Sequence, residues 1–77
     1  MTFEELKQEA KNMGMLIVEA NSMLKEHIWV TDNLCFYEGG NIVFDDVDVE
    51  SRHIVASDLT PNQMFTVMKA LRRKESK

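Results

Sequence analysis

The chain has 77 residues, a net charge of −4 and one cysteine, Cys35. A domain this small buries only about 60 to 65% of the surface that its unfolded chain exposes, and a single cysteine excludes an intrachain disulfide, so a metal or self-association is left to add stability. Cys35 stands between Leu34 and Phe36, and we expect a buried, reduced thiol.

The N-terminal region carries no targeting signal that we recognise. Glu4 and Glu5 occupy positions where a secretory signal has basic residues, and the uncharged apolar run over residues 13–18 is too short to cross a bilayer. We therefore expect a soluble, cytoplasmic protein that does not bind membranes.

The first predicted element is an amphipathic helix that begins at residue 3. Thr2 and Glu5 have the spacing of a capping box. Gly14 leaves two interpretations open, because it is a natural residue to end the helix and release a strand over residues 15–19. The alternative is one helix through residue 25, which we favour because a single apolar seam continues past the glycine: Phe3, Leu6, Ala10, Met13, Ile17, Ala20 and Leu24.

Three short segments after Lys25 are rich in β-branched and aromatic residues and predict strands: 28–30, 34–37 and 42–44. Gly39-Gly40 predicts a hairpin turn between the second and the third. If Glu38 pairs with Asn41, Tyr37 faces Ile42 and Cys35 faces Phe44. Both faces of this hairpin are then apolar, which predicts a cover on each side from the helices and from a second copy or a partner.

The end of the chain predicts one more strand over residues 53–57 and a helix that starts at Pro61, after Thr60 as its N-cap. Residues 74–77 are expected to fray. The fold class is therefore α+β, with an N-terminal helix, a three- to four-stranded antiparallel meander and a C-terminal helix. Residues 1–77 form one domain.

Acidic residues concentrate in one segment, which we predict to be a binding surface: Asp45, Asp46, Asp48 and Glu50. On a strand, the last three would project from one face at intervals of about 7 Å. Oxygen ligands so placed can bind Mg²⁺ or Ca²⁺, but no ligand loop of the EF-hand type surrounds them. A solvated edge strand and a surface for a basic partner are the other interpretations.

Other catalytic and binding chemistry is poorly supported by the residue spacings. His27 and His53 lack a zinc-ligand spacing, and Ser51 near His53 lacks the context of a nucleophile. Gly39-Gly40 is followed by a strand, whereas a phosphate loop opens a helix. Trp29 and Tyr37 lack the interleaved bases of a nucleic-acid surface. We predict no catalytic residue, metal site or cofactor.

The leading functional prediction is a non-enzymatic protein-interaction module, expected to form a homodimer and to serve as a small acidic regulator or inhibitor of a basic partner. Its apolar interface candidates are Trp29, Cys35, Tyr37, Ile42 and Phe44. The alternative is an oligomeric protein that binds an anion or nucleotide through Arg52, Arg72 and Arg73. Nucleic-acid binding by the basic C-terminal helix ranks third.

Overall fold

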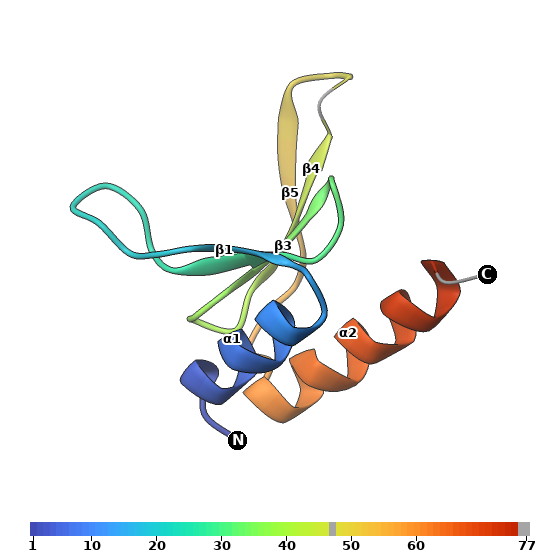
Figure 1. Cartoon of the computed structure of the whole chain (residues 1–77). Coiled ribbons are helices and arrows are strands. Elements are labelled where there is room, and N and C mark those ends of the chain that lie inside the picture. Colours follow the sequence, from blue (N-terminus) through green and yellow to red (C-terminus); the bar gives the residue numbers. More distant parts are fainter. Residues whose placement is uncertain (47, 76–77) are drawn as a thin grey trace.

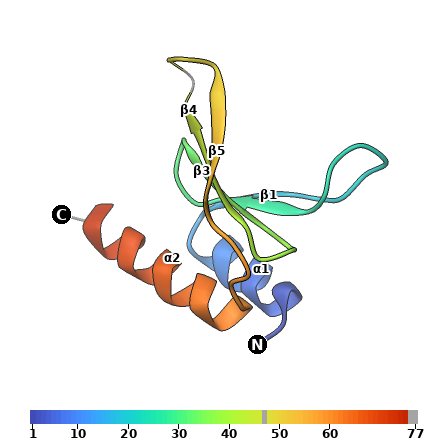
Figure 2. The same cartoon turned by 180° about the vertical axis from the view of Figure 1, so that it is seen from behind.

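The structure, a computed structural model, describes residues 1–46 and 48–75, with two helices and five strands. The elements are α1 (Phe3–Asn12), β1 (Leu16–Val18), β2 (His27–Trp29), β3 (Leu34–Tyr37), β4 (Ile42–Asp46), β5 (Ser51–Ala56) and α2 (Pro61–Glu75). The strands form one antiparallel sheet in chain order, and both helices lie against the same face (Figures 1 and 2). The predicted α+β class is confirmed, with one strand more than expected.

Both helices begin where the capping residues predict. In α1, the Glu5 backbone N–H donates to Thr2 Oγ1 at 3.1 Å and the Thr2 N–H donates to Glu5 Oε1 at 2.8 Å. Thr60 and Gln63 make the same reciprocal pair at the start of α2, at 3.2 and 2.8 Å. Two otherwise unpaired N–H groups are thereby satisfied at each helix start. Of the tail expected to fray, residues 74 and 75 belong to α2 and residues 76–77 lie outside the described part.

Gly14 ends α1, so the single long helix favoured from the sequence is wrong. Gly14 has φ of +81°, and the backbone N–H groups of Gly14 and Met15 donate to the carbonyls of Lys11 and Ala10, each at 3.0 Å. These bonds satisfy carbonyls at the helix end that have no partner within the helix. The apolar seam continues past the glycine because Ile17 of β1 packs against the same core as the helix residues.

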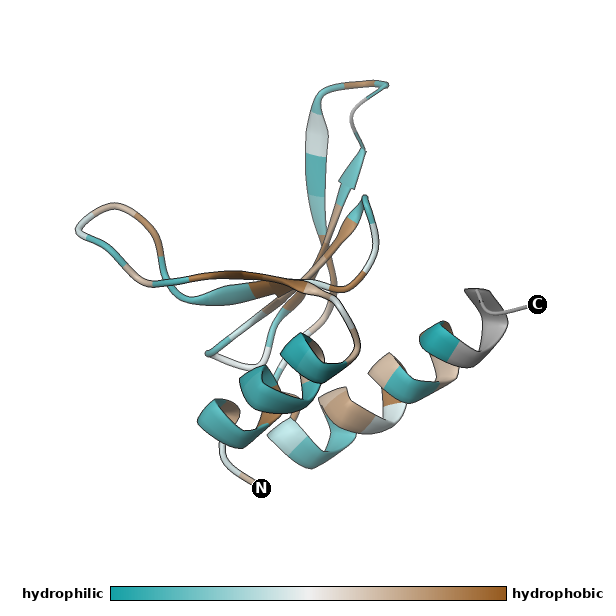
Figure 3. Ribbon diagram, viewed as in Figure 1, coloured by the Kyte–Doolittle hydropathy of each residue, from teal (hydrophilic) through white to brown (hydrophobic). Residues whose placement is uncertain are grey.

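The core lies between the helices and a row of side chains that crosses the sheet. Ile28, Phe36 and Ile42 are directly opposite one another on β2, β3 and β4, and each is at most 4% exposed. In the buried cluster they meet Val30 and four helix side chains: Leu6, Ala10, Met64 and Met68. Full burial of one such large apolar side chain contributes about 1.5 to 3 kcal/mol. Figure 3 shows hydrophobic residues gathered where the strands cross above the helices.

The β3–β4 turn lies at the predicted glycines, but the register predicted for the hairpin is wrong by one residue. The Tyr37 N–H donates to the Asn41 carbonyl at 2.8 Å and the Gly40 N–H donates to the Tyr37 carbonyl at 3.0 Å, so the loop has three residues, Glu38 to Gly40. Cys35 therefore faces Val43 instead of Phe44. A slip of one residue exchanges the two faces of a strand.

Two of the predicted interface residues are moved to the helix side of the sheet by this register. Ile42 lies opposite Phe36 and is 4% exposed, so it belongs to the core. Phe44 lies opposite Leu34, whose side chain packs against the core. Ile42 and Phe44 thus do not share a face with Cys35 and Tyr37, as the sequence analysis had expected.

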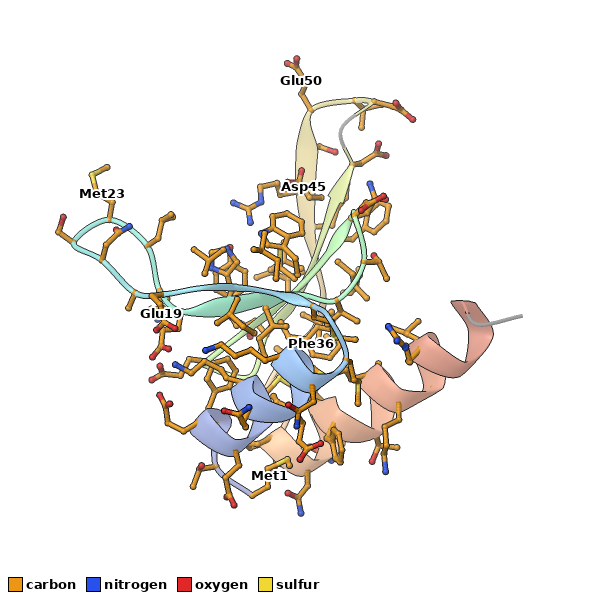
Figure 4. The ribbon with its side chains drawn as sticks, in the orientation of Figure 1. Met1, Glu19, Met23, Phe36, Asp45 and Glu50 are labelled. Carbon is orange, nitrogen blue, oxygen red and sulfur yellow. The ribbon has the colours of Figure 1, made fainter. Side chains whose placement is uncertain are left out.

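Two hairpin arms extend away from the helices. The β1–β2 connection ends near Met23 and the β4–β5 hairpin ends near Glu50, and the two tips point in different directions (Figure 4). In the second arm, Ile42 pairs with Ala56 but Val43 pairs with Ile54, so Val55 is an extra residue in β5. Such a bulge increases the local twist and bends the strand.

Replacing Gly40 by alanine should lower the free energy of unfolding by about 2 to 4 kcal/mol. Gly40 has φ of +93°, and an added Cβ would lie 2.7 Å from the Leu59 carbonyl oxygen. Gly39→Ala is the matched control, because its Cβ would meet nothing within 4 Å and the change should stay within about 0.5 kcal/mol. Urea unfolding of both variants measures the difference, and equal midpoints would contradict the turn described above.

Candidate interaction face

The sheet face opposite the helices is covered by no described element. Antiparallel register places alternate residues of all five strands on it, and we call this set the open face: Leu16, Val18, His27, Trp29, Cys35, Tyr37, Val43, Asp45, Arg52 and Ile54. In Figures 1 and 4 the β4–β5 arm extends away from the helices, whereas the β1–β2 arm extends to one side of the sheet. The open face therefore has no packing partner among the residues that the structure describes.

Three aromatic rings form the centre of the open face. The His27 ring stacks on Tyr37 across the β2–β3 pair, with ring centroids 4.7 Å apart, and meets Trp29 edge to face at 6.1 Å. His27 Nδ1 lies 2.9 Å from the Lys25 carbonyl oxygen, which fits a proton on Nδ1. His27 is 5% exposed although no helix covers it, because its neighbours on the face surround it. Its ring is held by stacking and by this hydrogen bond, and it has no zinc-ligand arrangement.

Arg52 holds a polar corner of the open face. Its Nη2 donates to the Tyr37 hydroxyl at 2.7 Å, and its Nε lies 4.0 Å from Asp45 Oδ2. The Tyr37 bond joins β3 to β5 across the strand between them. Pairs this exposed contribute little to stability, so we assign Arg52 and Asp45 to the shape and charge of the surface.

Cys35 is fully buried beneath this corner. The pKa of its thiol is raised to about 11, mainly by burial; Arg52 lowers the pKa and Asp45 raises it, and both effects are smaller than that of burial. A thiol with so high a pKa is almost entirely protonated at neutral pH, and the thiolate is the nucleophilic form. The expectation of a buried, free thiol is confirmed.

Apolar residues at the two margins of the open face are strongly exposed. Leu16 of β1 is 63% exposed and Ile54 of β5 is 65% exposed. Trp29, Tyr37 and Val43 between them are only partly buried. Exposed apolar side chains on a sheet face that also carries a charged corner are typical of an interaction site.

The acidic residues do not form the row expected on one strand. Asp45 and Asp46 end β4, whereas Asp48 and Glu50 lie in the turn that follows; Val47 is outside the described residues. Asp46 Oδ1 accepts the Asp48 backbone N–H at 3.1 Å, and Glu50 has φ of +51°. Among the described residues, no group of three or more His, Cys, Asp or Glu is placed to hold a metal ion. We call these four residues the acidic arm.

The three arginines proposed as an anion site are not brought together. Arg52 contacts Tyr37 on the open face, whereas Arg72 Nη1 donates to the Met13 carbonyl at the end of α1, at 2.7 Å. The side chain of Arg73 lies outside the described residues. A single anion site made of Arg52 and Arg72 is therefore not supported.

Ser51 and His53 do meet, with Ser51 Oγ 3.0 Å from His53 Nε2. Both project from β5 on the side away from the open face, and His53 is exposed. A catalytic pair also needs a group that orients the histidine, and none of the described carboxylates forms an ion pair with His53. The contact is a hydrogen bond on the protein surface.

Comparison with known proteins gives no assignment. No protein-family model matches the chain, and searches of curated proteins and of solved structures found no match. In the part of the chain that the structure describes, no helix is long and apolar enough to cross a membrane.

Several residues of the open face were missed in the sequence, among them Leu16, Val18 and Ile54. The signal was present as alternation, since Leu16 and Val18 of β1 and Arg52 and Ile54 of β5, before the bulge, belong to the face. For Leu16 and Val18 it was hidden by the helical interpretation of residues 15–25. For Val43 it was hidden by the wrong register of the hairpin.

We expect Cys35 to react with a thiol reagent such as DTNB about two orders of magnitude more slowly than an ordinary cysteine at pH 8. The thiolate fraction at that pH falls by roughly this factor when the pKa rises from about 8.5 to about 11. The pKa of Cys35 is higher in the folded than in the unfolded protein. The free energy of unfolding is therefore highest below the unfolded-state pKa and falls as the pH rises toward 11. Reaction as fast in buffer as in denaturant would contradict the burial.

Proposed function

We propose that the protein is a non-enzymatic interaction module that binds another protein through the open face. The observation that carries the proposal is an uncovered sheet surface with three packed aromatic rings, Leu16 and Ile54 exposed at its margins and Arg52 at one corner. Aromatic residues and arginine are enriched where interface residues contribute most of the binding energy. We propose that Trp29 and Tyr37 are the residues of this face that contribute most to binding the partner.

The charge of the acidic arm favours a basic partner. Residues 45–52 hold four acids and one base, Arg52, and the whole chain has a net charge of −4. Complementary charge at the rim of an interface speeds association and selects the partner more than it adds affinity. A protein that covers a basic functional surface of another molecule would act as its inhibitor or regulator, which is the role we propose.

The remaining candidate functions have less support from the surface. At the open face, nucleic acid would meet one base, Arg52, close to the acidic arm, and its phosphates would be repelled; binding by the basic end of α2, the candidate taken from the sequence, would use a different surface. Catalysis would need a nucleophile and a base within reach. Cys35 is buried and its pKa is raised, and Ser51 meets a histidine that forms no ion pair with a carboxylate among the described residues.

A second copy of the chain is the simplest partner for the open face, and we expect the protein to self-associate at micromolar concentration. Leu16→Ser with Ile54→Ser should weaken this association at least tenfold without lowering the melting temperature, because both side chains are mostly exposed. Met23→Ser is the matched control, since Met23 is 87% exposed but lies at the tip of an arm (Figure 4). Analytical ultracentrifugation measures the molar mass in solution. A monomer of 8.9 kDa at all concentrations would exclude the homodimer.

Neutralising the acidic arm distinguishes between a basic partner and a second copy of the chain as the molecule that binds. Asp46→Asn, Asp48→Asn and Glu50→Gln together should preserve or raise folding stability, because these charges are close together and exposed or partly exposed. Association with a basic partner captured from the native cell should slow, and its dependence on salt should weaken. Stopped-flow kinetics measure both quantities. Unchanged rates and salt dependence would show that the acidic arm is only a solvated edge.

A further inference from the structure

Lys7 of α1 is buried against the β1–β2 arm, which we define as residues 19–26. The Lys7 side chain is 8% exposed, and its ammonium group lies 2.9 Å from Glu4 Oε1 and 3.3 Å from Glu19 Oε2. The same group pairs with Glu26. Glu4 belongs to α1, whereas Glu19 and Glu26 are the first and last residues of the arm. One buried cation thus joins both ends of the arm to the helix.

The arm has little else to hold it against the helices. Residues 20–25 are all exposed, and Met23 at the tip is 87% exposed (Figure 4). The bonds at the tip are local, since the N–H groups of Met23 and Leu24 donate to Asn21 Oδ1 at 2.7 and 2.9 Å. In the described part of the chain, no residue of the arm belongs to the core cluster or packs against it. The position of the arm therefore depends on its base.

A second contact at the base joins the arm to the β3–β4 turn. The Glu38 backbone N–H donates to the Glu26 carbonyl at 3.2 Å, and the Glu38 side chain also meets that of Glu26. Acids outnumber bases here. Among the described residues, the charged groups that face Lys7 or its partners are four carboxylates and one further cation: Glu4, Glu19, Glu26, Glu38 and Lys11.

The charges of this cluster respond to acid in one direction. Bonds to Glu26 and Glu4 raise the pKa of the Lys7 ammonium group, so Lys7 stays charged from acid to neutral pH. The bond from Lys7 lowers the pKa of the Glu26 carboxyl below its usual value of 4.5. A carboxyl whose pKa is lowered by folding stabilises the folded contact above its unfolded-state pKa, and this effect is lost as the pH falls through the folded-state pKa. The contact is therefore complete at neutral pH and is lost below pH 4.5.

Loss of the carboxylate charges would leave Lys7 buried beside neutral groups. A buried charge without an opposite charge is strongly destabilising, because it lacks the solvation that water provides. The ammonium group regains water if the arm moves away from it. The core need not open for this movement, since none of the described core residues lies in the arm.

We propose that Lys7 acts as a pH-dependent latch, which holds the β1–β2 arm against α1 at neutral pH and releases it in acid while the rest of the fold remains intact. Protonation of Glu19 and Glu26 breaks their ion pairs with Lys7, and the arm then moves about the β1–β2 strand pair. These two strands carry one end of the open face, so release of the arm loosens that end. The latch itself requires no partner.

Two neighbouring backbone amides report the latch separately from the fold. The Glu38 N–H is bonded to the Glu26 carbonyl of the arm, whereas the Tyr37 N–H is bonded to the Asn41 carbonyl across the β3–β4 turn, at 2.8 Å. Amide hydrogen exchange measured by NMR, relative to the intrinsic rate at each pH, gives the protection of each group. From about pH 7 to about pH 3.5, we expect the protection of Glu38 to fall about tenfold or more and that of Tyr37 by at most about threefold.

Variants assign the response to Lys7. Lys7→Met keeps the apolar stem of the side chain, and it should lower the protection of Glu38 about tenfold at pH 7 and remove most of its pH dependence. Glu19→Gln with Glu26→Gln keeps Lys7 and should have the same effect. Lys11→Met is the matched control one turn further along α1, because Lys11 is exposed and forms no ion pair among the described residues. It should leave both amides unchanged.

Three results would overturn the proposal. The first is an equal loss of protection at Tyr37 and Glu38 in acid, which would mean that the sheet opens as a whole. The second is a wild-type Glu38 protection that stays constant down to about pH 3.5. The third is a folded Lys7→Met or Glu19→Gln, Glu26→Gln protein that keeps the full wild-type response; circular dichroism establishes that each variant folds. The wild-type titration decides the first two results without any variant, and none of the three requires a partner of the open face.

Discussion

The position of Gly40 determines which residues of this protein face the helices and which face solvent. Its φ of +93° and its close approach to the Leu59 backbone allow a three-residue turn, and the Gly40 carbonyl accepts the Leu59 N–H at 3.0 Å. That turn sets the register of β3 against β4, which places Phe36 opposite Ile42 in the core. The same contact brings the chain after β5 beside the β3–β4 turn, just before α2 begins.

The open face follows from this register and from the small number of helices. Two helices cover one side of a five-stranded sheet, and no chain among the described residues is left to cover the other. On the open face the aromatic rings pack against one another. His27 and Cys35 are therefore buried although no second layer of helices covers this face. A solvated antiparallel face usually carries polar side chains, and Trp29, Val43 and Ile54 depart from that pattern. This departure is the physical basis of the proposal that a partner covers the face.

Elements whose signals are local were predictable from the sequence. Both capping boxes, the start of each helix and the location of the β3–β4 turn depend on residues three or fewer positions apart. The end of α1 was harder, because Ile17 continues a helical apolar spacing while it serves a strand that packs on the same core. The hairpin register was missed because Gly39-Gly40 is compatible with a two-residue turn and with a three-residue turn. The sequence does not show which of the two closes the hairpin.

Contacts between distant residues were beyond prediction, and they determine the sites. Lys7 is 7% exposed and forms ion pairs with Glu4, Glu19 and Glu26, of which only Glu4 is a helical neighbour. Its bonds to Glu26 and Glu4 raise the pKa of its ammonium group above the usual range. Through Glu19 and Glu26 it fixes α1 to both ends of the β1–β2 connection, and through that connection it fixes the strand that carries Trp29.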